Sequence, residues 1–257
     1  FPKPEILPGE EILKVEQLTA PGKYRDVSFM LRRGEVLGLT GLLGSGAKEL
    51  VRTLFGLDTP ASGRVEIGGK AARLANPTQA AGHKIALVPE DRRRHGVALD
   101  LSVAENTSLS SLGRFTRFGF LDRKGERREI DALIARLQVK TSGRDALLRT
   151  LSGGNQQKVA IAKWLSRHSE VYLLDEPTVG VDIGSKVEIY TLIGELAARG
   201  AGVIVLSSDL PELLGITDRI LVLFRGRIVR EFISSDTTAD AVLAEATGSS
   251  EGQRHVG

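Results

Sequence analysis

The chain has 257 residues, of which 41% are hydrophobic, 26% charged and 5% aromatic, and its formal net charge is +3. This composition is typical of a folded globular protein, and so mild and dispersed an excess of positive charge does not indicate a nucleic-acid-binding surface. No run of about 18 apolar residues is present, so no membrane-spanning helix is predicted. Cysteine is absent, which excludes disulfides, thiolate metal sites and cysteine nucleophiles and is compatible with the cytosol.

The first third of the chain predicts a linker followed by an α/β core. Residues 1–10 are rich in proline, which favours an extended linker and a chain that is a fragment of a longer polypeptide. In residues 11–90, short β-rich runs alternate with a helical pattern. EILKVEQL and RDVSFML predict an antiparallel pair, and GEVLGLT predicts a buried strand that enters a glycine loop and a helix. This order is the order of a parallel α/β sheet.

Residues 91–150 interrupt the alternation, because the β signal disappears and helical spacing takes over in SVAENTSLSSL and KGERREIDALIARLQ. We expect a helical subdomain inserted into the sheet domain. Residues 151–233 return to the α/β pattern, and residues 234–257 are expected to form a polar tail with one short helix. The predicted fold class is therefore α/β, with a mostly parallel core sheet, an antiparallel β subdomain and an inserted α-helical subdomain.

The segment GLTGLLGSGAKEL has the glycine spacing of a phosphate-binding loop. Its backbone N–H groups would converge at a helix N-terminus, whose dipole favours an anion. The full pattern G-x-x-x-x-G-K-[ST] requires lysine followed by a hydroxyl, where this chain has Ala47 and Lys48. A glycine-rich turn also arises for packing alone, so both roles stay open at this point. The candidate residues are Gly41, Gly44, Ser45, Gly46, Ala47 and Lys48.

An apolar strand in VYLLDEPTVGVD ends in two adjacent carboxylates, Asp175 and Glu176. Such a pair is costly at the end of a buried strand unless a cation or a reacting water awaits it. With the glycine loop upstream, Asp175 is expected to hold Mg²⁺. Glu176 is expected to be the catalytic base or to orient the attacking water, as in phosphate-loop NTPases.

A third motif, LSGGNQQK, lies just ahead of the acidic strand. Ser152 is a natural N-cap residue, and Gly153 and Gly154 leave the start of its helix bare of side chains, so that a phosphate can approach the backbone. A serine followed by two glycines is common at helix starts. The position of LSGGNQQK, after the glycine loop and before the acidic strand, favours a functional role.

These motifs, together with VPEDRRRHG, SVAENTSL and SSDLPELLGITDRI, resemble an ATP-binding-cassette (ABC) ATPase domain from about Glu11 to Phe232. They are most similar to the second, C-terminal cassette of tandem-cassette ATPases that energise bacterial monosaccharide importers of the ribose, galactose, arabinose and xylose type. The resemblance implies ATP and Mg²⁺ as cofactors, ATP hydrolysis coupled to sugar transport, and a peripheral position on the cytoplasmic face of the bacterial membrane.

The resemblance also implies partners. They are the first cassette of the same polypeptide, the membrane permease subunits and, indirectly, a sugar-binding protein, but no nucleic acid. Each ATP site of the family lies between two cassettes. The signature residues Ser152, Gly153, Gly154 and Gln156 would therefore serve the ATP bound by the partner cassette, and the region from Arg92 to His95 with the helical subdomain would receive a permease helix.

Several positions depart from the family pattern. Ala47 removes the ammonium that faces the phosphates, and Lys48 puts a cation where the family has a Mg²⁺-liganding hydroxyl. Glu90 replaces a glutamine and Ser208 a histidine. The adenine-stacking aromatic is also missing, because Tyr24 lies too far along the chain. We expect a degenerate site that catalyses poorly, a chain that is weak or inactive alone, and an intact signature that serves the partner.

Two other functions remain open from the sequence. The domain could be a non-hydrolysing regulatory or dimerising cassette, although the retained Asp175 and Glu176 argue mildly against that. It could also belong to a non-transport ABC ATPase of DNA repair or translation, but neither a long coiled-coil insertion nor a strongly basic arm is present. No residue in the chain indicates which sugar would be transported.

Overall fold

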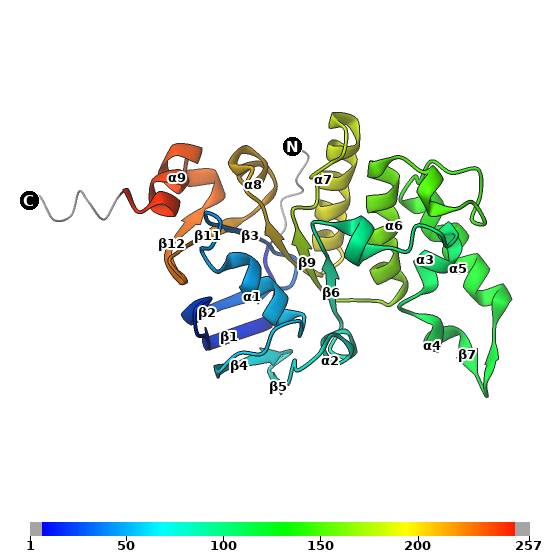
Figure 1. Cartoon of the computed structure of the whole chain (residues 1–257), viewed down its shortest axis with the longest axis horizontal. Helices are drawn as coiled ribbons and strands as arrows, with labels where there is room; N and C mark the ends of the chain where they lie inside the picture. The colour runs from blue at the N-terminus through cyan, green and yellow to red at the C-terminus, as the bar shows by residue number, and fades with distance from the viewer. Residues whose placement is uncertain (1–6, 250–257) are drawn as a thin grey trace, which may run out of the picture.

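The computed structural model describes residues 7–249 and contains two main β-sheets flanked by helices (Figure 1). Residues 1–6 of the predicted linker and residues 250–257 of the predicted tail lie outside the described residues. Among the residues described, no helix is long and apolar enough to cross a membrane.

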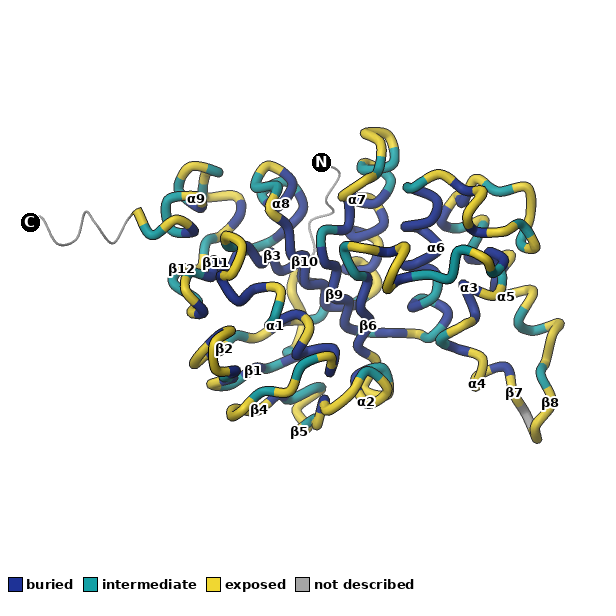
Figure 2. The backbone as a smooth tube through the Cα atoms, in the orientation of Figure 1, coloured by how far each residue is buried: buried dark blue, intermediate teal, exposed yellow. Residues whose placement is uncertain are grey.

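The central sheet runs in the order β12-β11-β3-β10-β9-β6. Its strands are β3 (Val36–Thr40), β6 (Ile85–Val88), β9 (Val171–Asp175), β10 (Gly202–Leu206), β11 (Arg219–Phe224) and β12 (Arg227–Ile233). Every neighbouring pair is parallel except the β11–β12 hairpin at one edge. β9 and β10 are buried along their whole length (Figure 2). Burial on both faces explains why their sequences are continuous apolar runs.

The second sheet is antiparallel, with the order β2-β1-β4-β5. Its strands are β1 (Glu11–Ala20), β2 (Tyr24–Arg32), β4 (Ser62–Ile67) and β5 (Lys70–Ala72). Helix α1 (Ala47–Leu54) contacts β2 of this sheet and β9 and β10 of the central sheet, so it lies between the two sheets. The predicted antiparallel subdomain and the mostly parallel core are thus both confirmed.

The inserted segment is mainly helical, as predicted, with α3 (Val103–Ser108), α4 (Leu112–Phe115) and α5 (Arg123–Arg136). A capping box between Ser102 and Glu105 begins α3. One hairpin, β7 (Thr116–Arg117) with β8 (Phe120–Leu121), was not predicted. Two-residue strands carry no periodicity. The turn instead depends on Phe118 and Gly119, both with left-handed φ (51° and 81°), as in a tight hairpin turn.

The remaining helices are α2 (Pro77–Gly82), α6 (Gly153–Ser166), α7 (Ile183–Ala198), α8 (Leu210–Ile216) and α9 (Ala239–Thr247), with a π-helical turn at Arg92–Gly96 and 3₁₀ turns at Leu148–Thr150 and Ser234–Asp236. α6 begins directly after its predicted N-cap, Ser152. α2 and α8 were not predicted, because each is only two turns long and begins at a side-chain cap, Asn76 or Asp209. α9, in the predicted tail, packs on β11 and buries Val242 and Ala246.

Candidate functional site

The carboxyl ends of four parallel strands meet along one edge of the central sheet. Leu39 of β3 pairs with Leu206 of β10, and Leu206 pairs in turn with Asp175 of β9. Leu174 of β9 pairs with Val88 of β6. The loops that follow these strands therefore lie side by side, at the edge where open α/β sheets bind ligands.

These loops enclose a small open pocket of about 270 Å³. The structure thus brings the glycine loop together with both candidate carboxylates and both altered positions. The lining residues are Gly41, Leu42, Leu43, Gly44, Ser45, Gly46, Ala47, Lys48, Glu49, Glu90, Asp175, Glu176, Leu206, Ser207 and Ser208.

The glycine loop takes a conformation that requires its glycines. Gly44 and Gly46 have left-handed φ values of 80° and 95°. A Cβ on Gly46 would lie 2.5 Å from the carbonyl oxygen of Lys23, and one on Gly41 would lie 2.4 Å from Oγ of Ser45. Gly46 is the N-cap of α1, and no side chain caps that helix. The first N–H groups of α1 therefore keep the arrangement that favours an anion.

Lys48 faces carboxylates in the pocket. Its ammonium donates a hydrogen bond to Glu90 and lies 3.9 Å from Oδ2 of Asp175. The hydrogen bond to Glu90 is the main cause that raises the pKa of Lys48 above its ordinary value, so the side chain is charged at neutral pH. The preceding residue, Ala47, is only 3% exposed and contributes no charge. The positive charge of the pocket therefore belongs to an ion pair within the protein.

Asp175 is the most strongly perturbed group of the site. Its side chain is 8% exposed. Burial is the main cause that raises the pKa of Asp175 to about 6, while the charge of Lys48 opposes that shift and those of Glu90 and Glu176 add to it. Its Oδ1 atom is buried and has no hydrogen-bond partner among the described residues. A raised carboxylate pKa in a cleft is a feature of functional sites.

Glu176 is held in a strained conformation by the strand ends. Its φ is 48°, a left-handed value that costs a non-glycine residue about 1 kcal/mol or more. Its N–H donates to the carbonyl oxygen of Leu206 (2.8 Å), and its carboxylate accepts bonds from the N–H of Ser208 (2.8 Å) and the hydroxyl of Ser207 (3.4 Å). The backbone of Ser208 thus orients the carboxylate that the sequence marks as catalytic.

The residues of this pocket do not fit Mg²⁺. That ion requires a near-octahedral set of oxygen ligands. Glu90 and Asp175, the two carboxylates nearest Lys48, already face its ammonium, and position 48 supplies a charge of the same sign as the metal. In residues 7–249, no three Asp, Glu or His side chains form a group that could hold a metal ion. The structure therefore gives no support to Asp175 as a metal ligand.

The LSGG motif forms the N-terminus of α6. Ser152 is the N-cap, is exposed, and accepts a hydrogen bond from Nδ2 of Asn155 (2.8 Å), while no side chain caps the helix itself. A Cβ on Gly154 would lie 2.2 Å from Oγ of Ser185, and one on Gly153 would lie 2.6 Å from a nitrogen of Arg92. The glycines therefore let α7 and the Arg92 side chain approach the start of α6.

Gln156, the fourth predicted signature residue, points into the protein. It is 1% exposed, and its Nε2 donates to the carbonyl oxygen of Leu151 (3.0 Å). Its side chain supports the turn that leads into α6 and is not available to a ligand outside the protein.

Arg92 connects the LSGG motif to the loop after Glu176, whereas the sequence assigned it only to the region that would receive a permease helix. Its guanidinium donates to the carbonyl oxygens of Val179 (3.0 Å) and Gly180 (3.2 Å), in the loop after Glu176. It is 8% exposed, and burial lowers its pKa. Its neighbours Arg93, Arg94 and His95 are exposed.

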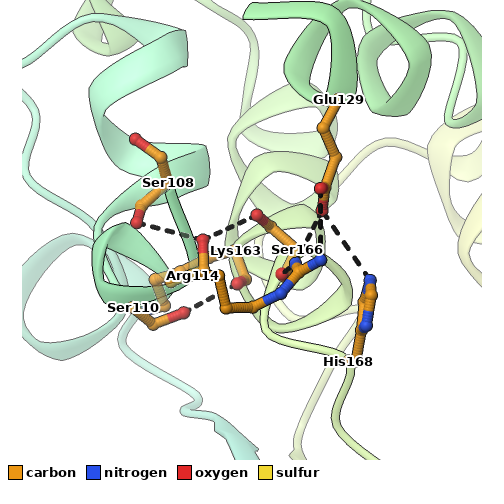
Figure 3. Close-up of polar contacts among 8 residues, drawn as sticks. Ser108, Ser110, Arg114, Glu129, Lys163, Ser166 and His168 are labelled. Carbon is orange, nitrogen blue, oxygen red and sulfur yellow. Dashed lines mark hydrogen bonds and ion pairs between the residues drawn. The ribbon is translucent and has the colours of Figure 1, made fainter. Parts of the chain in front are cut away.

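The other end of α6 is fastened to the helical segment (Figure 3). The Arg114 guanidinium donates to the carbonyl oxygen of Ser166, the last residue of α6, and pairs with Glu129 of α5 (2.9 Å). The Ser110 hydroxyl donates to the carbonyl oxygen of Lys163 (2.7 Å). The helix that carries the LSGG motif is therefore fixed to α4 and α5.

A further aromatic candidate is excluded by its position. Tyr24 is 2% exposed, and its hydroxyl donates to Oγ1 of Thr53 (2.8 Å) under α1. Its ring is a core group and cannot stack on a base. No aromatic ring is among the residues that line the pocket.

A glycine loop that leads from a parallel strand into a helix, beside an acidic strand end, defines a nucleotide-binding domain of the phosphate-loop class. The comparisons narrow that class. The family model for ABC transporters matches residues 24–179. The chain belongs to the ABC transporter family, as an ATP-binding cassette.

Similar curated proteins are ribose import ATP-binding proteins named RbsA. The protein of Pseudomonas putida is 53% identical over 253 residues, which cover 98% of this chain and 49% of that protein. The protein of Cereibacter sphaeroides is 55% identical over 240 residues, covering 93% of this chain and 48% of the relative. The chain thus spans about half the length of the curated relatives it matches.

Solved structures confirm the fold. The cbiO1 protein of Clostridium perfringens, part of the ABC transporter complex cbiONQ, superposes with a TM-score of 0.76 at 24% identity, covering 91% of this chain and 93% of that one. A nucleotide-free ATP-binding cassette of an ABC transporter gives a TM-score of 0.75 at 22% identity, with 91% and 96% covered. Cassettes of this family in general bind ATP and Mg²⁺.

Proposed function

We propose that this chain is the second, C-terminal cassette of a tandem ATPase that powers monosaccharide import, with ribose as the first candidate because the relatives are named for it. The observation that carries the proposal is the contrast between the two motifs. Ser152 is exposed at an uncapped helix start, whereas the ammonium of Lys48 is already paired with Glu90. Such a domain is better suited to complete the ATP site of a partner cassette than to form a complete ATP site with its own glycine loop.

The signature would act on ATP bound by the first cassette. The hydroxyl of Ser152 and the free N–H groups at the start of α6 would bind the γ-phosphate there, since an uncapped helix N-terminus favours an anion. Gln156 is left out of this contact because it is buried. Its role is to hold the turn in place.

The pocket of the glycine loop would contribute little to hydrolysis. Glu176 retains a position suited to orienting a water, but no lysine stands at position 47 and no histidine at 208. Loss of one such electrostatic contact typically lowers a rate by about 100-fold. We therefore expect this chain alone to hydrolyse ATP barely above background.

The helical segment offers a surface for the permease. A hollow of about 600 Å³ lies between α3, α4 and α5, and the half-exposed side chains Leu109, Leu112 and Leu147 line it. A hollow in which leucines lie beside charged residues such as Arg123 and Glu126 fits an amphipathic helix. The exposed Arg93, Arg94 and His95 lie on the same segment of chain that leads into it.

A non-hydrolysing regulatory cassette is the second candidate, and the Lys48–Glu90 ion pair favours it. The regulatory cassette and the transport cassette differ in one measurable way. A purely regulatory domain would tolerate loss of the Ser152 hydroxyl, whereas a domain that completes the partner's ATP site would not.

The direct test is sugar transport. The tandem polypeptide that contains this chain would be reconstituted with its permease in proteoliposomes, and ATP-driven uptake of labelled ribose would be measured. Ser152→Arg, which blocks the signature, is expected to abolish uptake, and Lys70→Ser on the remote β5 strand is the matched control. Uptake that persists in Ser152→Arg would refute the proposal. Transport of another monosaccharide instead of ribose would correct only the sugar.

A further inference from the structure

The pocket of the glycine loop carries an unusual charge distribution. Its lining contains one cation, Lys48, and four acids, Glu49, Glu90, Asp175 and Glu176. Three of these acids, Glu90, Asp175 and Glu176, lie at or just after the carboxyl ends of β6 and β9. The side of the pocket away from the glycine backbone is therefore negative, and Lys48 is the only lining side chain that offsets it.

The backbone side of the same pocket is intact. The left-handed glycines at 44 and 46 keep the loop open, and a Cβ at Gly44 would meet nothing within 4 Å. Consecutive N–H groups at the start of α1 can still bind one or two phosphate groups. A third phosphate would extend toward the carboxylates, two of which already face the ammonium of Lys48, so like charges would meet there.

We propose that this pocket takes the diphosphate group of a nucleoside diphosphate without a divalent metal, and that it disfavours the γ-phosphate of a triphosphate. This proposal depends on the proposed function in one respect only, namely that the glycine loop binds a nucleotide. The ammonium of Lys48 lies within ion-pair distance of Glu90 and Asp175 and supplies a positive charge to phosphate oxygens in the pocket. It has three N–H donors, so it can bind a phosphate oxygen while it keeps its bond to Glu90.

The small size of the pocket agrees with this ligand. A volume of about 270 Å³ has room for a diphosphate group. The buried ring of Tyr24 offers no stacking surface to the base. The phosphates would thus supply most of the binding, and the kind of base would matter little.

The test is calorimetric titration of ADP and of ATP into this chain, each in EDTA and in excess Mg²⁺. We expect ADP to bind at least about tenfold more tightly than ATP in EDTA, because one more phosphate charge meets the carboxylates. Mg²⁺ is expected not to tighten the binding of ADP. Binding of ATP as tight as that of ADP, Mg²⁺-dependent binding of either, or no binding of both would overturn the proposal.

Two variants locate the effect. The double variant Lys48→Ser, Glu90→Gln removes the ion pair and supplies neutral oxygen ligands, so Mg²⁺ should now tighten ATP binding by about tenfold or more. Lys70→Ser, an exposed lysine on β5, should leave every affinity unchanged. Thermal unfolding checks that both variants fold. A chain that binds no nucleotide would refute this inference but leave the role of Ser152 in the partner's site standing, because the transport assay tests that role separately.

Discussion

The glycine loop and the LSGG helix are two versions of the same local structure, a glycine-bearing helix start without a side-chain cap. In both, packing requires the glycines, since a Cβ on Gly46 or Gly154 would collide with a neighbour. They differ in the side chains that surround the helix start. Ser152 is exposed, whereas Lys48 is tied to Glu90. The comparison shows that the same glycine-bearing helix start can be surrounded by side chains of quite different charge.

The largest effect is expected where the loop backbone is most constrained. Gly46→Ala forces a left-handed residue against the carbonyl oxygen of Lys23 and should lower the free energy of unfolding by about 3 kcal/mol. Gly44→Ala has the same kind of φ but meets no neighbour, so about 1 kcal/mol is expected. Denaturant unfolding measures both. Equal losses in the two variants would mean that the close approach at Gly46 costs nothing.

A slightly smaller effect is expected from the buried carboxyl of Asp175, whose pKa is about 6. The unfolded value is about 3.9, so the folded protein binds this proton more tightly than the unfolded chain does. Its contribution to stability is complete below about pH 4 and is lost as the pH rises through about 6. The free energy of unfolding of Asp175→Asn, minus that of the original chain, should therefore rise by about 2–3 kcal/mol as the pH is raised from 4 to 7. If the free energies of unfolding of the two proteins change with pH in the same way, the raised pKa does not belong to Asp175.

On the signature side, Gly154→Ala should cost about 1–2 kcal/mol, because its Cβ would lie 2.4 Å from Cβ of Ser185. The conflict is with one side chain. Ser185→Gly leaves only its Cα, at 3.8 Å, and should restore part of the loss in the double variant. Strictly additive losses in a double-mutant cycle would place the strain elsewhere.

Much of the fold could be predicted from local patterns. Strands such as β9 and β10 are buried on both faces and are therefore continuous apolar runs, and α6 begins at the Ser-Gly-Gly start that the sequence shows. Elements held by one cap and little periodicity, such as α8 and the β7–β8 hairpin, were missed because a short segment carries too few residues to show a period.

The site was predictable as a set of residues but not as a set of contacts. The motifs named Lys48, Glu90 and Asp175 separately, since strand order alone does not fix which side chains meet. The sequence also did not predict the directions in which two side chains point. Gln156 lies in the LSGGNQQK motif yet faces inward, and Arg92 lies in a basic run yet is buried against the loop after Glu176. Both side-chain directions depend on packing against segments that are distant in the sequence.

The central claim is that this cassette serves its partner's ATP more than its own. The most direct measurement is steady-state ATP hydrolysis by the tandem polypeptide that contains this chain, in which Ser152→Ala is compared with Glu176→Gln. The account predicts that Ser152→Ala lowers turnover by about 100-fold, as for loss of one transition-state donor, while Glu176→Gln changes it by less than about threefold. The opposite order, with Glu176→Gln the damaging change, would show that this chain's own pocket carries the hydrolysis and would contradict the account.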